Sequence, residues 1–357
     1  MSYTMCSMGL KKYLYYYDYI FIVISSILFV FGTSNLYENY TLPLSIASIF
    51  ILLGCWLIRG IKINLPKNYI LYLVFLVFLS IHTAIYGGKI VYIFLFLSGG
   101  LYWITVYNLR VTISKYFFNF LILLGIIMAG ITAGSLALGL TYSNANSLFL
   151  PAEKGSLHNH LGDLWAIIIT GVIYKAIQKF HIWQIPLIAL GVIIIAFSLS
   201  RSAILALVVG TMYTYWQSTT KKMPKWILIT TIGIASIIFI FSSSFKTTLF
   251  SRPYVGESIG SLIKYPFGIG IGNFVKASHE STSAHNVLLE IVSGMGIYSI
   301  IFIIWSIKVL RSLVTSKNNV MYMALLLAIS VNFLFDTTYI IPTMLWTWFS
   351  VLGLSCT

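Results

Sequence analysis

Long apolar segments that lack charged residues recur along the whole chain and restrict its fold more than any other feature. Tyr19–Thr33 and Tyr116–Leu138 contain no Asp, Glu, Lys or Arg. A helix crosses the hydrocarbon core of a bilayer with about 20 mostly apolar residues. Only 8% of the 357 residues are charged, whereas soluble domains carry about 25%. The sequence therefore predicts an all-α, polytopic integral membrane protein and excludes a cytosolic enzyme, a secreted disulfide scaffold and a disordered chain.

The apolar segments predict about 12 transmembrane helices within a single membrane domain, residues 1–357. Leu164–Ile177 is the weakest of these spans because Lys175 lies inside it. No small-residue cleavage motif follows the first segment, so we expect a membrane helix there rather than a signal peptide. The expected spans are Tyr19–Thr33, Leu42–Ile58, Tyr69–Ile85, Ile90–Val106, Tyr116–Leu138, Leu164–Ile177, Trp183–Leu199, Ala203–Trp216, Trp226–Phe241, Val287–Ile307, Val320–Phe335 and Thr343–Leu354.

Basic residues are distributed unevenly between the connections on the two sides of these spans. With the N-terminus in the cytoplasm, about 15 Lys and Arg residues fall on the inner side and about 7 on the outer side, as the positive-inside rule expects. We therefore expect both termini to be cytoplasmic. The net charge of +14 reports this topology and gives no reason to expect nucleic-acid binding.

Polar residues collect in two outer connections. The first, Gly139–Asp163, contains His158, His160 and Asp163, and the second, residues 242–284, is the longest in the chain. Connections between neighbouring helices need only a few residues, so long polar ones are where function is expected.

Arg201 lies between two apolar segments, in the sequence Leu199–Leu205. A guanidinium at the membrane border is costly unless it pairs or faces a wet cavity. Its planar fork of donors also suits phosphate. The position of Arg201 on the outer side, against the charge rule, favours a functional role over an arginine that only marks the interface.

His285 precedes the apolar segment that starts at Val287, and Asn286 and Glu290 share one face of the expected helix. An imidazole at such a helix start can act as a general base towards a hydroxyl or donate a hydrogen bond to a phosphate oxygen. The alternative is a polar N-terminal cap with Glu290 as its buried partner.

Two further groups have structural alternatives. His158, His160 and Asp163 are too few and too irregularly spaced for a standard metal site, and we expect no metal there; they cap the next helix or line the outer cavity. His82 and Asp336 lie near the outer ends of spans and are expected to be satisfied interfacial residues.

Two motifs together resemble the O-antigen ligase and O-antigen polymerase family of polytopic membrane glycosyltransferases. Arg201–Leu205 fits the family's Arg-x-x-x-Leu at a helix junction. Pro266–Gly270, followed by His285-Asn286 and Gly296, fits its second motif, although that motif's second glycine would fall at Ser299. The resemblance covers roughly residues 200–305, and the first half is similar to the family only in hydropathy.

The resemblance implies a multi-pass protein of the bacterial inner membrane, with a periplasmic cavity and a long periplasmic loop at residues 242–284. It implies a glycan donor on undecaprenyl pyrophosphate, no nucleotide sugar, no cofactor and no required metal. Arg201 on the pyrophosphate and His285 as the base, or as the residue that orients the acceptor, would be the catalytic pair. The substrate-binding residues would be Arg252, Lys264, Asn286 and Glu290.

The acceptor divides the functional alternatives. An O-antigen ligase transfers the glycan to lipid A-core, which the two motifs favour, whereas a polymerase uses a second lipid-linked repeat and a third member of the family glycosylates protein. A flippase or other transporter for lipid-linked glycan is the alternative from another class. Transporters carry charged or broken sites near mid-membrane in both halves, whereas these spans are apolar at their centres.

Overall fold

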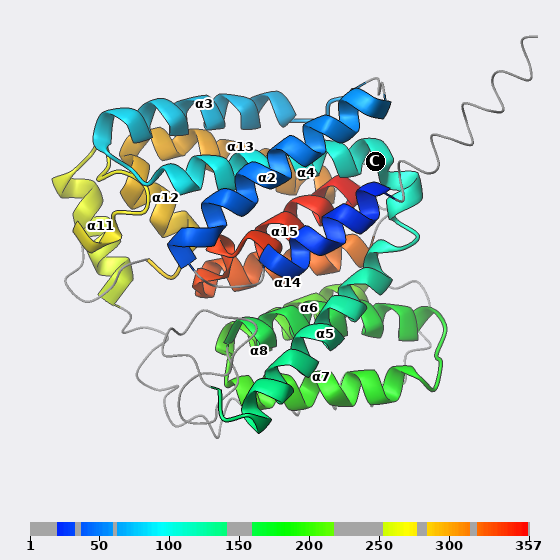
Figure 1. Ribbon diagram of the computed structural model, residues 1–357. Coiled ribbons are helices and arrows are strands. Elements are labelled where there is room, and N and C mark those ends of the chain that lie inside the picture. Colours follow the sequence, from blue (N-terminus) through cyan, green and yellow to red (C-terminus); the bar gives the residue numbers. More distant parts are fainter. Residues whose placement is uncertain are drawn as a thin grey trace, which may run out of the picture.

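The computed structural model describes residues 20–32, 37–59, 63–140, 159–217, 253–276, 284–314 and 320–355, drawn as ribbons in Figure 1. Every regular element in these ranges is a helix. The predicted all-α class is therefore confirmed for this part of the chain. Of the expected outer loop at residues 242–284, the structure describes 253–276 and Ala284.

The helices follow the order of the apolar segments. They are Ile20–Gly32, α2 (Tyr37–Arg59), α3 (Tyr69–Tyr86), α4 (Ile90–Ile113), α5 (Phe117–Ala137), α6 (Asn159–Gln178), α7 (Gln184–Ser198), α8 (Arg201–Gln217), α11 (Pro253–Lys264), α12 (Val287–Met295), α13 (Ile300–Val314), α14 (Val320–Phe335) and α15 (Pro342–Ser355). Short 3₁₀ turns occur at η2 (Phe274–Lys276), η3 (Gly296–Ser299) and η4 (Thr337–Ile340).

Five helices are long and apolar enough to cross a membrane: α3, α4, α5, α6 and the run Val287–Leu313, which joins α12 and α13. Shorter apolar helices occupy Ile20–Gly32, Thr41–Leu57, Gln184–Ser198 and Val320–Phe335. Each expected span within the described residues overlaps helical structure, and the span expected at Val287–Ile307 is divided into α12, η3 and α13. The span expected at Trp226–Phe241 lies outside the described residues.

Helix α6 is the most enclosed of the five, because 89% of its most apolar 18-residue stretch is buried inside the protein. It packs on α5, α7, α8 and α14. Gly162 and Gly210 allow these close approaches, because a Cβ at either position would meet a side-chain atom of Ser198 or Thr170 at under 3 Å. Lys175, which weakened this span in the sequence, lies near its end with Nζ 4.4 Å from the centre of the Phe118 ring. Its charge thus lies over an aromatic face rather than in the middle of the helix.

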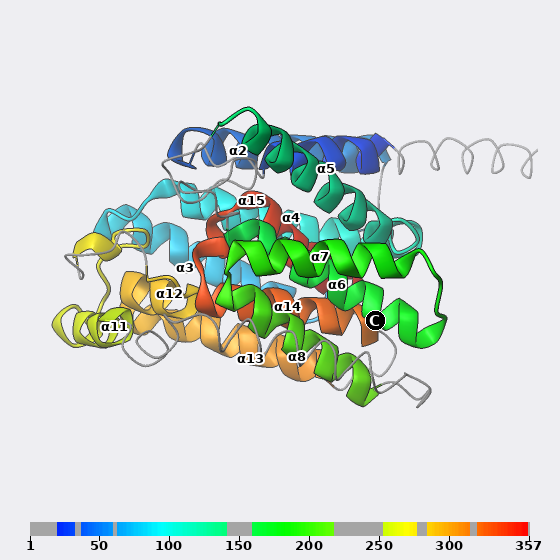
Figure 2. The same cartoon turned by 90° about the horizontal axis from the view of Figure 1, so that it is seen from below.

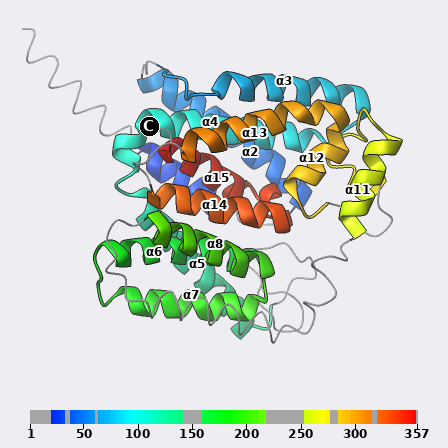
Figure 3. The same ribbon diagram turned by 180° about the vertical axis from the view of Figure 1, so that it is seen from behind.

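The remaining helices form a second group, with α15 packed on α4 and α14, and α2 packed on α4. Figures 1 and 3 show this group on one side of α14 and helices α5 to α8 on the other. Seen from below, α2 and α5 both lie towards one edge of the molecule (Figure 2), although Figure 1 shows them well apart. Large aromatic side chains fill the core; Trp346, for example, is fully buried and donates from Nε1 to Oγ of Ser98 at 2.8 Å.

Hydrogen bonds bring many helix ends to one end of the bundle. Lys89, before α4, donates its backbone N–H to the Ile271 carbonyl at 2.8 Å, and Asn286, before α12, donates to the Leu334 carbonyl near the end of α14 at 2.7 Å. The side chain of Asn332 reaches the carbonyl of Asp163, near the start of α6, at 3.3 Å. Connections far apart in the sequence therefore meet at this end.

Candidate functional site

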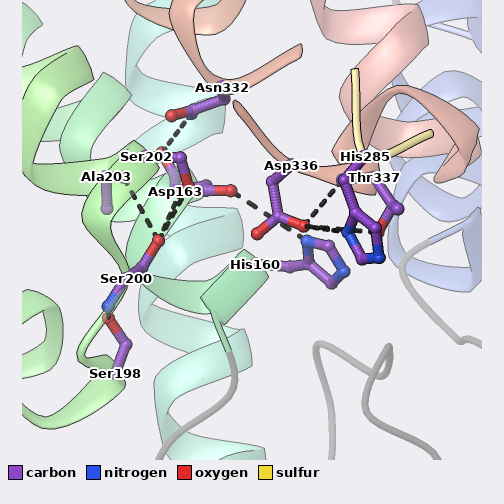
Figure 4. Close-up of polar contacts among 10 residues, drawn as sticks. All are labelled: His160, Asp163, Ser198, Ser200, Ser202, Ala203, His285, Asn332, Asp336 and Thr337. Atoms are coloured by element: carbon purple, nitrogen blue, oxygen red, sulfur yellow. Dashed lines mark hydrogen bonds and ion pairs between the residues drawn. The ribbon is translucent and has the colours of Figure 1, made fainter. Parts of the chain in front are cut away.

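A cluster of polar side chains lies where the starts of α6, α8 and α12 meet the end of α14 (Figure 4). His160 and Asp163 come from α6, His285 from the residues before α12, and Asp336 from the residue after α14. His160 is 1% exposed and Asp163 is completely buried. We call His160, Asp163, His285 and Asp336 the polar cluster.

Asp163 joins α6 to the turn between α7 and α8. Its Oδ1 accepts hydrogen bonds from the hydroxyls of Ser200 at 2.9 Å and Ser202 at 2.8 Å. Its Oδ2 lies 4.0 Å from Nδ1 of His160 on the same helix face, one turn away. Burying a carboxylate is costly unless it has such hydrogen-bond partners. The serines on either side of Arg201 are therefore explained by their hydrogen bonds to Asp163.

The turn that carries these serines depends on an unusual backbone conformation. Leu199 ends α7 with φ +52°, in the left-handed region. Ser200 then caps α8, accepting from the backbone N–H of Ala203 at 3.2 Å. Arg201 is the first residue of α8 and its side chain is partly exposed. Arg201 therefore begins its helix between two serines that bind Asp163.

His285 also has a left-handed backbone, with φ +47°. Asn286, the next residue, caps α12 by accepting from the backbone N–H groups of Leu288 and Leu289 at 2.8 and 3.0 Å. Non-glycine residues with positive φ cost conformational energy and cluster at functional sites. The Oδ1 atom of Asn286 is thus engaged by the start of α12, and this cap fixes the backbone next to His285.

Asp336 faces His285 from the opposite side of the cluster. Its Oδ1 lies 4.0 Å from Nδ1 of His285, and the two side chains are 13% and 37% exposed. The same oxygen accepts from the backbone N–H of Thr337 at 2.6 Å. Burial raises the pKa of Asp336, but the facing imidazole, the charge of His160 and the Thr337 N–H lower it by more, so the pKa of this carboxyl lies below its ordinary value.

His160 connects the two acidic residues. His160, Asp163 and Asp336 each place one potential ligand atom within 4.8 Å of the others, a grouping that could hold a metal ion. The sequence analysis grouped His160 and Asp163 with His158, expected no metal there, and did not place Asp336 beside them. Oδ1 of Asp163 already accepts hydrogen bonds from two hydroxyls. The four side chains of the polar cluster also form a row in which carboxylates and imidazoles alternate, in the order Asp163, His160, Asp336 and His285.

The expected substrate-binding residues lie in several places. Arg252 lies outside the described residues. Lys264 ends α11, is exposed, and places Nζ 5.3 Å from the centre of the Tyr265 ring. Arg201 and His285 are brought to the same end of the bundle through Asp163, His160 and Asp336.

Glu290 holds the glycine-rich loop, residues 266–273, in place. It is 1% exposed, and its two carboxylate oxygens accept from the backbone N–H groups of Gly272 at 3.1 Å and Ala284 at 3.0 Å. The Tyr339 hydroxyl donates to it at 3.4 Å. Glu290 therefore supports the residues around His285 from within, as the buried-partner interpretation expected, and does not reach an open surface.

The glycine-rich loop packs tightly against α12 and α3. Gly268, Gly270 and Gly272 all have positive φ. The loop donates from Ile269 and Gly270 to carbonyls of α12, and His82 Nε2 lies 2.6 Å from the Phe267 carbonyl. His82 is thus satisfied at Nε2, whereas its buried Nδ1 has no hydrogen-bond partner among the described residues, so the satisfied residue expected from the sequence is found only in part.

An apolar cavity of about 150 Å³ opens beside the polar cluster. Val287 and Leu288, which follow His285 and Asn286, line it together with Leu334, two residues before Asp336. The other lining residues are Phe96, Phe302, Trp305, Ser306, Val309, Leu310, Ser330, Phe333, Leu345, Trp348 and Phe349. A polar site therefore adjoins a space that suits a hydrocarbon chain.

Sequence reasoning missed Asp336 as the partner of His285 and Ser200 and Ser202 as partners of Asp163. The signal was weak: a carboxylate at the end of an apolar span, and two serines around Arg201. No family model, curated protein or solved structure matches this chain.

Proposed function

We propose that this protein is a membrane glycosyltransferase that uses a glycan linked to undecaprenyl pyrophosphate, and that it acts as an O-antigen ligase. The observation that carries the proposal is the pairing of His285 with the largely buried Asp336 beside an apolar cavity. An imidazole oriented by a carboxylate is suited to accept a proton from a sugar hydroxyl. The adjoining cavity supplies a place for one segment of a polyprenyl chain.

In the proposed reaction, an acceptor hydroxyl attacks the anomeric carbon of the donor glycan. The hydroxyl proton passes to Nε2 of His285, because Asp336 faces Nδ1 and stabilises the imidazolium. The new glycosidic bond forms as the bond between the anomeric carbon and the pyrophosphate oxygen breaks. Lipid pyrophosphate leaves with the bonding electron pair, and attack from the opposite face inverts the anomeric centre.

Arg201 is assigned to the pyrophosphate. It begins α8 with a partly exposed side chain, and the helix start adds a partial positive charge on the same side. Lys264, at the end of α11, is a weaker candidate for binding the pyrophosphate. Arg252 is a second weaker candidate, which rests on its position in the sequence. The placement requires a multi-pass protein of the bacterial inner membrane with this end facing the periplasm and both termini in the cytoplasm.

The decisive experiment compares Arg201→Ala and His285→Ala with His181→Ala, an exposed histidine in the connection between α6 and α7. The variants are reconstituted in vesicles with lipid-linked glycan and lipid A-core, and the joined product is measured. We expect both site variants to lose product while the donor remains intact, and His181→Ala to retain normal turnover. Normal turnover in both site variants would refute the assigned roles.

The acceptor is identified in a deletion strain. Loss of every lipid A species that carries glycan beyond the core indicates a ligase. Retention of core with a single repeat indicates the polymerase, which would use the same site with a second lipid-linked glycan as acceptor. Accumulation of the donor on the cytoplasmic face alone would instead indicate a flippase and would contradict catalysis at this end.

A further inference from the structure

Helix α11 presents apolar side chains outwards and polar ones inwards. Val255, Ile259 and Ile263 recur every four residues and are 50%, 54% and 78% exposed. Ser258 and Ser261, on the other side, are 1% and 4% exposed, where α11 packs on α12. A helix that faces water has the reverse arrangement, so the outer face of α11 is not suited to water.

The helix lies at the end of the bundle that carries the polar cluster. Figures 1 and 3 show α11 running steeply across the direction of α3 and α13, beside the end where α12 begins. A helix that crosses the ends of membrane-spanning helices lies close to the plane of the bilayer surface. This is the orientation of interfacial amphipathic helices.

The exposed apolar surface continues from α11 to a candidate membrane span. Phe267, just after α11, is 50% exposed, and the centre of its ring lies 6.3 Å from that of Tyr298. The Tyr298 ring lies 6.3 Å from that of Phe78 on α3, which is 38% exposed. The outward face of α3 continues this surface with Ile81 and Ile85. The surface of α11 is therefore continuous with one that lipid covers if α3 spans the membrane.

The end of α11 has the side chains typical of a membrane border. Lys264 is exposed and lies over the ring of Tyr265, which is 37% exposed. Tyrosine and lysine are favoured at the headgroup level, where the ammonium group meets lipid phosphates. The charge of Lys264 and the apolar face of Val255, Ile259 and Ile263 thus both fit a lipid bilayer surface.

From these contacts we infer that α11 lies in the membrane interface on the side of the polar cluster. Val255, Ile259 and Ile263 insert among the lipid acyl chains, and Lys264 binds headgroup phosphate. The chain continues from α11 into the glycine-rich loop, which is bonded to α12 and to Glu290. Lipid contact on α11 is therefore linked through this loop to Glu290, which supports the residues before α12. The inference is independent of the proposed reaction.

Single-cysteine labelling tests this placement in the full-length chain. Cys6, Cys55 and Cys356 are replaced by serine, and Ile259→Cys, Ile263→Cys and Lys264→Cys are each labelled with an environment-sensitive fluorophore. The protein is reconstituted in phosphatidylethanolamine and phosphatidylglycerol vesicles. Quenching is measured with nitroxide groups on the acyl chains and with iodide in the water. Circular dichroism confirms that each labelled variant retains the helical signal of the parent.

The two sides of the helix should respond in opposite ways. The probes at positions 259 and 263 lose fluorescence with acyl-chain nitroxide and resist iodide, whereas the probe at position 264, one residue away, is quenched by iodide. If iodide quenches the probes at positions 259 and 263, the face lies in water and the inference is wrong. If neither quencher reaches them, protein covers this face, which also overturns it.

Discussion

The Asp336 carboxylate faces the His285 imidazole at 4.0 Å, although the two residues belong to different helix junctions. Asp336 follows α14, and His285 precedes α12. Asn286 ties the two junctions together through its hydrogen bond to the Leu334 carbonyl. The orientation of the imidazole is therefore a property of the packed helices rather than of a local loop.

Asp336→Asn should abolish most glycosyl transfer while the protein still folds. The amide keeps the shape of the side chain but removes the charge that stabilises the imidazolium, so we expect turnover to fall about 10²–10⁴-fold. Turnover in vesicles measures this. Thr337→Val, which removes only the 3.3 Å hydroxyl bond to Asp336, is the matched control and should retain most activity.

The stability of Asp336→Asn relative to the parent should depend on pH. Because the pKa of Asp336 is lowered in the folded protein, its carboxylate stabilises the fold at every pH above its ordinary value of 3.8. That contribution is lost as the pH falls from 3.8 towards the lowered pKa of the folded state. The difference in unfolding temperature between parent and variant should shrink as the pH falls below about 4, where the carboxylate becomes protonated. A difference that grows on acidification contradicts this.

The sequence predicted the helices well and the site only in part. Hydropathy located the apolar helices because each lipid-compatible helix must satisfy its backbone internally and carry apolar side chains. The roles expected of Arg201 and His285 were inferred from their positions at membrane borders, where charge is costly. Both inferences depend on residues that are neighbours in the sequence.

Contacts between distant segments could not be inferred in the same way. Nothing in the local sequence around Asp336 distinguishes a catalytic partner from an interfacial carboxylate. Glu290 shares a helical face with Asn286, as expected, but only the packed structure shows that Gly272 and Ala284 donate to it. The pairing depends on which helix ends meet, and hydropathy carries no information on that.

Removal of the serines around Arg201 should destabilise the α7–α8 turn unequally. Ser202→Ala removes one hydrogen bond to buried Asp163 and should lower the free energy of unfolding by about 1 kcal/mol. Ser200→Ala also removes the cap of α8, so the loss should be about 2 kcal/mol. Thermal unfolding in detergent compares the two. Equal effects would show that the cap contributes nothing.

Glu290→Gln should destabilise the protein more than Tyr339→Phe. One oxygen of Glu290 would become an amide nitrogen, which then faces a backbone N–H of Gly272 or Ala284 as donor against donor. We expect a loss of about 1–3 kcal/mol, because a buried donor is left unsatisfied. Tyr339→Phe removes only a 3.4 Å hydrogen bond and should cost less than about 1 kcal/mol. Unfolding temperatures of the two variants distinguish this role from direct substrate binding, which would leave stability unchanged in both.

Gly296→Ala and Gly260→Ala should change stability in opposite directions. Gly296 has φ +58°, and a Cβ there would lie 2.2 Å from the Pro266 carbonyl oxygen, so the glycine-rich loop would have to move. Strain and overpacking together predict a loss of about 3 kcal/mol or more. Gly260, in α11, has open space around its Cβ position, and alanine there should add up to about 1 kcal/mol because it favours the helix. Unfolding temperatures measure both, and if Gly296→Ala is as stable as the parent, the loop is not the tightly packed support of His285.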